Sequence, residues 1–132
     1  MHRLPLFLMA SLAFAMPAAA DPFAALPIGG QWRVVAIAGE AVPSGAEITL
    51  SRAAADSVGG KVICNTWSRP ISASGEKLML GGLTTTKMLC DFDFFKYEFA
   101  FNDLLGKVDS VREAAGGIEL LANGAVVITA AR

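Results

Sequence analysis

Histidine is almost missing from this sequence of 132 residues, and the single one, His2, lies at the N-terminus, ahead of the first apolar segment. Histidine is the usual general base of Ser and Cys hydrolases and a frequent ligand of zinc and copper. Its absence after residue 20 argues against those catalytic pairs and metal sites, although a Ser–Lys pair stays open in principle. We predict no catalytic residue, no metal and no cofactor.

Other signatures of catalysis or of nucleic-acid binding are also missing. Gly59-Gly60 and Gly81-Gly82 lack the lysine and the surrounding pattern of a phosphate-binding loop. Asp91 and Asp93 form the closest carboxylate pair, but carboxylates at the start of a helix are already explained by the helix dipole. The 11 Lys and Arg residues do not outnumber the 12 Asp and Glu residues, so no basic surface for nucleic acid is expected.

The N-terminus has the pattern of a secretory signal peptide. His2 and Arg3 give a basic start, an apolar run covers residues 4–16, and Ala18 and Ala20 form an A-x-A cleavage site. An uncleaved anchor is less favoured, because a membrane-spanning helix needs about 20 apolar residues. No cysteine for lipid attachment follows Ala20. The sequence predicts a signal peptide over residues 1–20 and a periplasmic or secreted protein with no membrane span after cleavage.

Cleavage after Ala20 would leave 112 residues, a usual size for one domain. Residues 21–29 hold two prolines and no clear period, so we predict an extended lead-in there. The domain proper is predicted over residues 30–132.

The sequence has two cysteines, Cys64 and Cys90. In an exported protein an even pair favours a disulfide, and the absence of a C-x-x-C arrangement argues against a redox pair. The alternative is two buried reduced thiols that pack as small apolar groups.

Short runs of β-branched and aromatic residues, separated by turn signals, predict strands. Their close spacing favours an antiparallel meander over parallel βαβ units. Asn123-Gly124 is the strongest hairpin signal, since a type I′ turn needs two residues with positive φ. The predicted strands are 31–38, 47–51, 61–68, 78–80, 110–114, 117–122 and 125–130.

Apolar residues at spacings of three and four predict a helix from Asp91 to Leu105. Gly106 is expected as a left-handed C-cap. We expect Phe95 and Phe99 to broaden the apolar stripe that packs on the sheet. The stripe itself is Phe94, Tyr97, Phe101, Leu104, Leu105 and Val108.

Together these residues form a pattern similar to that of the META-domain family, which includes HslJ-like bacterial heat-shock proteins. The matching features are Trp32 in the opening strand, Cys64-Asn65, Thr86-x-Met88-x-Cys90, the helical residues Glu98, Phe101 and Leu105, and a closing hairpin over 118–128. The resemblance spans about residues 30–130. It departs at Ile63, where the family prefers glycine.

The resemblance implies an α+β fold, with a curved antiparallel sheet or partial barrel of about six to eight strands and one helix (about 91–105) across it. It implies structural roles for Trp32, Asn65, Thr86, Met88, Glu98, Phe101 and Leu105. The family has no agreed catalytic residues, and its members resemble envelope or secreted proteins connected with stress responses.

Three functions remain open from the sequence. The first is a non-enzymatic envelope protein, stress-related or an accessory binding protein, whose partner is an unknown envelope protein or a small ligand. The second is a periplasmic inhibitor of a secreted protease, with residues 21–29 as its inserting arm. The third is a binder of an apolar ligand in a groove between helix and sheet.

Overall fold

The computed structural model describes residues 2–3, 5, 8–14 and 20–132 of the chain. Residues 1, 4, 6–7 and 15–19 of the predicted signal peptide lie outside the described residues. The elements are β1 (Gln31–Ile37), β2 (Glu40–Ala41), β3 (Thr49–Ala54), β4 (Ser57–Val62), β5 (Asn65–Ser74), β6 (Lys77–Leu80), β7 (Thr84–Thr85), the 3₁₀ helix η1 (Phe92–Phe94), α1 (Phe95–Leu105), β8 (Ser110–Ala114), β9 (Gly117–Ala122) and β10 (Ala125–Ala131).

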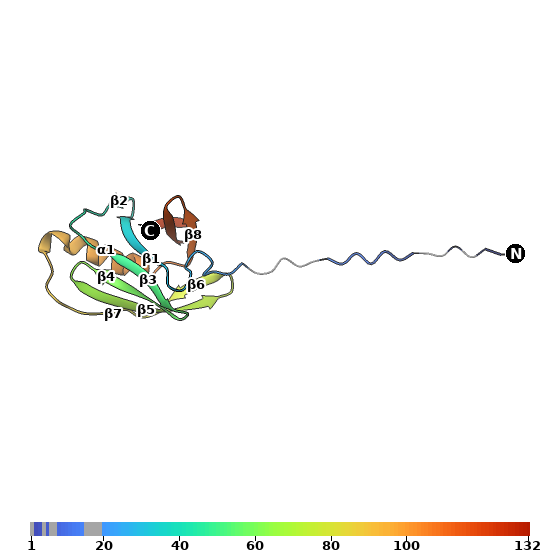
Figure 1. Cartoon of the computed structure of the whole chain (residues 1–132), viewed down its shortest axis with the longest axis horizontal. Coiled ribbons are helices and arrows are strands. Elements are labelled where there is room, and N and C mark those ends of the chain that lie inside the picture. The colour runs from blue at the N-terminus through green and yellow to red at the C-terminus, as the bar shows by residue number, and fades with distance from the viewer. Residues whose placement is uncertain (1, 4, 6–7, 15–19) are drawn as a thin grey trace.

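The strands form one antiparallel sheet in the order β6-β5-β4-β3-β1-β10-β9-β8, with β2 added to β1 and β7 added to β5. The sheet curves so far that its two ends approach each other. Leu78 N on β6 donates to Asp109 O beside β8 at 3.0 Å, and Lys77 pairs with the Asp109 carboxylate at 3.0 Å. The barrel is not closed by a continuous ladder, and Figure 1 shows α1 lying across the sheet, behind β1 and β3 in this view. The predicted α+β fold is confirmed.

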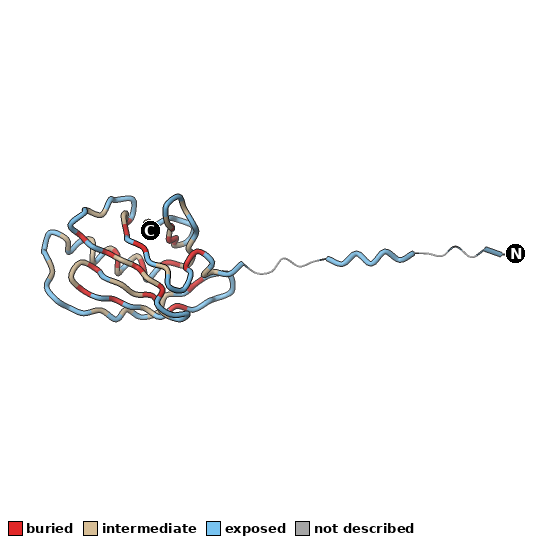
Figure 2. Tube along the Cα trace, viewed as in Figure 1, coloured by how far each residue is buried: buried red, intermediate tan, exposed pale blue. Residues whose placement is uncertain are grey.

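The core lies between the curved sheet and one side of α1, as the buried segments in Figure 2 show. Phe101 and Leu105 are fully buried, and the Phe101 ring meets the Trp67 ring edge-on at 5.2 Å between centroids. Burying such a side chain contributes about 1.5–3 kcal/mol. The expectation for Phe95 and Phe99 is wrong: both are exposed, because they lie on the opposite side of α1 from Phe101.

Two hairpin turns explain the strand boundaries. Asn123 (φ 52°) and Gly124 (φ 80°) form the predicted turn between β9 and β10. The predicted strand 61–68 is in fact divided by a second two-residue turn, in which Val62 pairs with Asn65. Ile63 has φ 60° there. The left-handed region favours glycine, so the one departure from the family pattern falls where a glycine would relieve backbone strain.

The second half of the predicted strand 61–68 continues beyond its predicted end, through Pro70. β5 continues to Ser74, because its partner changes at the proline: pairing with β4 stops at Pro70, and pairing with β6 starts at Ile71. A proline, which has no N–H to donate, is tolerated at such an exchange of partners.

Gly106 also differs from the expectation. Its φ is −64°, so it is not a left-handed cap. A Cβ at Gly106 would lie 3.2 Å from the Arg69 Nη1 atom. Arg69 donates from Nη2 to Asn102 O at 2.8 Å and from Nη1 to Gly81 O at 2.9 Å, and burial lowers the pKa of its guanidinium. The glycine therefore makes room for an arginine that binds the C-terminal end of α1.

Residues 21–29 are not the extended lead-in that the prolines suggested. They form successive turns, with Leu26 N donating to Phe23 O at 2.8 Å, and Ala25 and Leu26 belong to the core. The cause is distant in sequence. Arg52, buried on β3, donates from Nη1 to Leu26 O at 2.7 Å, and its guanidinium carbon lies 4.6 Å from the centre of the Phe23 ring.

We expect Arg52→Ala to lower the free energy of unfolding by about 2–3 kcal/mol, because hydrogen bonds from a charged donor contribute about 1.5–3 kcal/mol and Leu26 O would lose its partner. Urea denaturation measures this change, and hydrogen exchange should be faster over residues 23–30. Arg33→Ala is the matched control, since Arg33 is exposed on β1, and should change stability by no more than about 0.5 kcal/mol. Equal effects of the two substitutions would contradict this role of Arg52.

Candidate functional site

The structure brings most of the predicted motif residues together around one buried amide, that of Asn65. Asn65 is the first residue of β5 and is 2% exposed. The turn at Ile63 directs the Asn65 side chain under the segment that leads from β7 to η1. The segment 86–90, which carries the Thr-x-Met-x-Cys pattern, lies over this amide.

The Asn65 side chain uses its full hydrogen-bonding capacity. Its Oδ1 atom accepts from Met88 N at 2.7 Å and from Thr86 Oγ1 at 2.9 Å. Its Nδ2 atom donates to Met88 O at 3.1 Å and to Glu98 Oε1 at 2.9 Å, with Cys90 Sγ at 3.3 Å. A side-chain amide has two donors and one acceptor oxygen. Asn65 can therefore hydrogen-bond to both the N–H and the C=O of Met88, as the backbone of a neighbouring strand would.

The disulfide between Cys64 and Cys90 adds a covalent link at the same place. The two Cα atoms are 5.5 Å apart, and Cys64 N also donates to Cys90 Sγ at 3.1 Å. The bridge joins the turn between β4 and β5 to Cys90, two residues before η1. The predicted disulfide is confirmed, and the alternative of two reduced thiols is not what the structure has.

Glu98 anchors α1 to this cluster through its hydrogen bond with Asn65. It lies in the first turn of α1, is half-buried, and accepts from Asn65. The β4–β5 turn, the 86–90 segment and the helix are thus joined through one carboxamide. We name this set of contacting residues, Cys64, Asn65, Thr86, Met88, Cys90 and Glu98, the Asn65 cluster.

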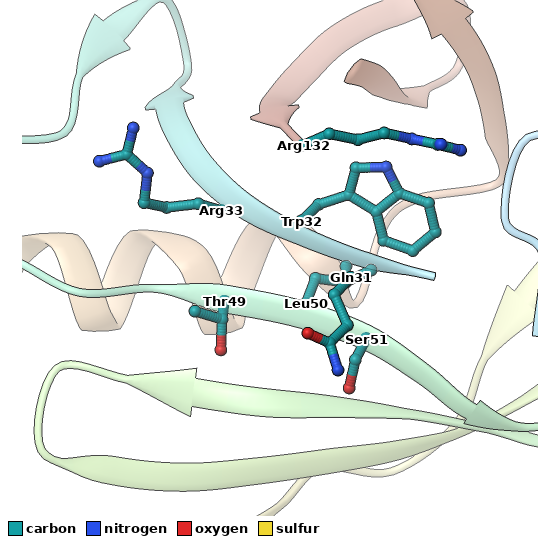
Figure 3. A pocket seen from close by; sticks show the side chains of 7 residues that line it. All are labelled: Gln31, Trp32, Arg33, Thr49, Leu50, Ser51 and Arg132. Atoms are coloured by element: carbon teal, nitrogen blue, oxygen red, sulfur yellow. The ribbon is translucent and has the colours of Figure 1, made fainter. Parts of the chain in front are cut away.

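Trp32 does not belong to the Asn65 cluster. It is buried on β1, and a separate pocket lies beside it, lined by the seven residues labelled in Figure 3 from β1, β3 and the C-terminus. The Trp32 Nε1 atom is buried without a hydrogen-bond partner in the described part of the chain. Phe101 and Leu105 are core residues on the buried side of α1, so these three motif residues stabilise the fold and do not line the groove described next.

An apolar groove opens above the Asn65 cluster, with a volume of about 420 Å³. Its walls are the 85–90 segment on one side and the start of the helical region on the other. Several of its large apolar side chains are exposed, above all Met88, Leu89, Phe92 and Phe95. Its lining consists of Asn65, Thr85, Thr86, Lys87, Met88, Leu89, Cys90, Phe92, Phe95 and Glu98.

Sequence reasoning missed Leu89, Phe92 and Phe95 as site residues. The apolar pattern of the helix places aromatic residues on two faces, and only one face is needed for the core. That excess of aromatic residues was a usable signal, because an amphipathic helix ordinarily carries a single apolar stripe. The 85–90 wall gave no such signal, since its position depends on Asn65.

A surface ion pair holds the outer side of the helical region to β2. Lys96 Nζ lies 3.0 Å from Glu40 Oε1, and Tyr97 Oη donates to the same oxygen at 3.4 Å. The hydrogen bond from Lys96 holds the pKa of Glu40 below its ordinary value, and the hydrogen bond to Glu40 raises the pKa of Lys96. Lys96 is therefore engaged away from the groove.

Within residues 2–3, 5, 8–14 and 20–132, no three His, Cys, Asp or Glu residues are grouped closely enough to hold a metal ion. Nor does that part of the chain contain a helix with the length and apolar character needed to cross a membrane.

The fold and the site together define a class: a small, open antiparallel partial barrel with one helix across it, in which a buried asparagine and a disulfide fix a loop beside an apolar groove. The family model described as META domain matches residues 24–132. The chain belongs to the META domain family, as the motif residues predicted.

A similar solved structure is the NMR structure of a protein from Burkholderia xenovorans, with 27% sequence identity, a TM-score of 0.63 and coverage of 98% of both chains. No curated protein matches the chain.

Proposed function

We propose that this META-domain protein is exported, loses residues 1–20, and acts outside the cytosol as a non-enzymatic binding protein that takes an apolar group into the groove above the Asn65 cluster. The observation that carries the proposal is the groove itself. Exposed Leu89, Phe92 and Phe95 gather around one hollow. Contiguous apolar surface of this kind marks binding sites, since leaving it in water is unfavourable.

The rigidity of one wall supports binding. Both backbone groups of Met88 are held by Asn65, and Cys90 is tied to Cys64. A wall fixed in this way loses little conformational entropy when a ligand binds, which favours affinity.

The non-enzymatic character rests on what the polar motif residues already do. The Asn65 amide is hydrogen-bonded to the Thr86 hydroxyl and to Oε1 of Glu98, and the two cysteines are bonded together. A general base or nucleophile needs a free atom within reach of a substrate. These side chains are instead used to hold the loop, which is the structural role that the family resemblance implies.

The docking of residues 21–29 weighs against the protease-inhibitor alternative. An inserting arm has to leave its own domain, whereas Ala25 and Leu26 are buried here and Arg52 binds Leu26 O. The stress-related role stays a prediction from the family resemblance. Export is tested by the mass of the chain recovered from the envelope or the medium, which should begin at Asp21.

We expect Phe95→Asp to weaken binding of the neutral fluorescent dye N-phenyl-1-naphthylamine at least tenfold, because a lost apolar contact of about 1.5–3 kcal/mol corresponds to a factor of ten or more. Phe99→Asp is the matched control. Phe99 lies one turn further along α1 with a similar exposed fraction, 67% against 61% for Phe95, but it does not line the groove. The dye should bind the Phe99→Asp variant as it binds the unchanged protein. Absence of dye binding, or equal losses in both variants, would refute the groove as the binding site.

A further inference from the structure

The wall of the groove formed by residues 85–87 is also a free sheet edge. β7 pairs with β5 on one side, Trp67 facing Thr85, and no other strand of the described chain pairs with β7. Thr86 N donates to Thr66 O at 3.1 Å and Met88 N donates to Asn65 Oδ1 at 2.7 Å, so both amides point inward.

Because amide groups alternate in direction along an extended strand, the N–H and C=O groups of Thr85 and Lys87 point outward, away from β5. Neither residue has a backbone hydrogen bond to another part of the described chain on that side. An extended partner would therefore find two residues with unpaired donors and acceptors at the spacing of an antiparallel ladder.

The free edge and the apolar groove share residues. Thr85, Thr86 and Lys87 line the same hollow as Phe92 and Phe95. A strand added along Thr85–Lys87 would direct every second side chain to the same face. One large apolar side chain of that strand would then enter the groove while its backbone pairs with the edge.

The charge around the groove indicates which residues of the partner strand would flank its inserted apolar side chain. Glu98 lines the groove, and Asp91 and Asp93 flank the lining residue Phe92. Lys87 is the positive charge that lines the groove opposite these three carboxylates. Lys96 is not counted, because it is paired with Glu40. The rim is thus net negative. A second copy of this chain would bring the same negative rim against itself, whereas a basic partner would be attracted.

From this geometry we infer that the groove binds an extended polypeptide segment of another protein, which pairs with the backbone of Thr85 and Lys87, inserts one large apolar side chain between Met88 and Phe95, and carries a Lys or Arg beside it. The inference rests on the proposed function, which requires only that the groove accept an apolar group, and it adds the class of partner.

The test starts from the chain beginning at Asp21, which holds every residue of the core. Random octapeptides displayed on phage are selected on this protein and counter-selected on the Phe95→Asp variant. We expect the enriched peptides to share a large apolar residue next to Lys or Arg. In the bound state, hydrogen exchange of the Thr85 and Lys87 amides should slow at least tenfold.

A backbone-modified peptide then distinguishes strand pairing from simple apolar contact. N-methylation at the peptide amides that face the edge should weaken binding about tenfold or more, since two hydrogen bonds are lost. N-methylation at the alternate amides of the same peptide is the control and should have little effect.

The outcomes separate the two proposals. If the dye binds in the groove, three results would overturn the peptide inference and leave the proposed function standing. They are the absence of any enriched peptide, equal effects of the two N-methylated peptides, and a self-associated dimer as the bound species. Failure of both dye and peptides to bind at the groove would overturn both.

Discussion

Asn65→Ala should lower the free energy of unfolding by about 3–5 kcal/mol, since each buried polar group left without its partner costs about 1–3 kcal/mol. The substitution leaves Met88 N without an acceptor and Met88 O without a donor, and it removes the hydrogen bond from Asn65 Nδ2 to Glu98 Oε1. Urea denaturation followed by tryptophan fluorescence measures the loss.

The matched control is Asn102→Ala. Asn102 is on α1, and its Oδ1 atom is buried without a hydrogen-bond partner in the described part of the chain. Its removal breaks no side-chain hydrogen bond of that part, and alanine is the better helix former by up to about 0.7 kcal/mol. We expect a change near zero or a small gain in stability. A loss at Asn65 no larger than that at Asn102 would show that the Asn65 cluster does not hold the loop.

Replacing Cys64 and Cys90 together with alanine should cost roughly 3.5 kcal/mol on the chain-entropy model for a closed loop of this length. The bridge spans a sequence separation of 26 residues. It also fixes Cys90 at the end of the 85–90 wall of the groove, so we expect affinity for the apolar dye to fall along with stability. Thermal and urea unfolding of the double variant measure the first effect, and dye titration measures the second.

Reductant supplies the control for this second prediction. Dithiothreitol should shift the unfolding midpoint of the unchanged protein toward that of the double variant, and it should leave the double variant unaffected. A double variant as stable as the oxidised protein would contradict a stabilising role for the bridge.

The parts of the fold that followed from sequence are those fixed by neighbours along the chain. The Asn123-Gly124 turn is determined by the two residues that form it. The helical region of η1 and α1 is determined by apolar spacing, and its beginning by the Asp91 side chain, which caps η1 by accepting from Asp93 N. Local patterns of this kind act before tertiary contacts are known.

The parts that sequence reasoning missed depend on contacts between distant residues. The fold of residues 21–29 is set by Arg52, which lies 26 positions beyond Leu26. Ile63 takes a glycine-like φ in the two-residue turn between Val62 and Asn65, and the residues that follow it, Cys64 and Asn65, are held by the 86–90 segment. No pattern within residues 21–29 predicts the contact with Arg52, and no pattern around Ile63 predicts the contact with the 86–90 segment.

The candidate site was predicted as a set of residues and not as a surface. The motif residues Asn65, Thr86, Met88 and Glu98 do come together, but as the support of the groove. The sequence pattern predicts Phe95 as part of the packed stripe and gives Phe92 no role, because apolar spacing cannot tell a second exposed face from a broad buried one.

The most direct test of the central claim uses the two methionines that follow residue 20, Met79 and Met88. Both are exposed to a similar degree, 56% and 58%, but only Met88 lines the groove. With the methyl groups labelled with carbon-13, titration with the apolar dye or a selected peptide should shift the Met88 methyl resonance and leave that of Met79 in place. Equal shifts of both resonances, or a shift of Met79 alone, would contradict the claim that the groove above the Asn65 cluster is the binding site.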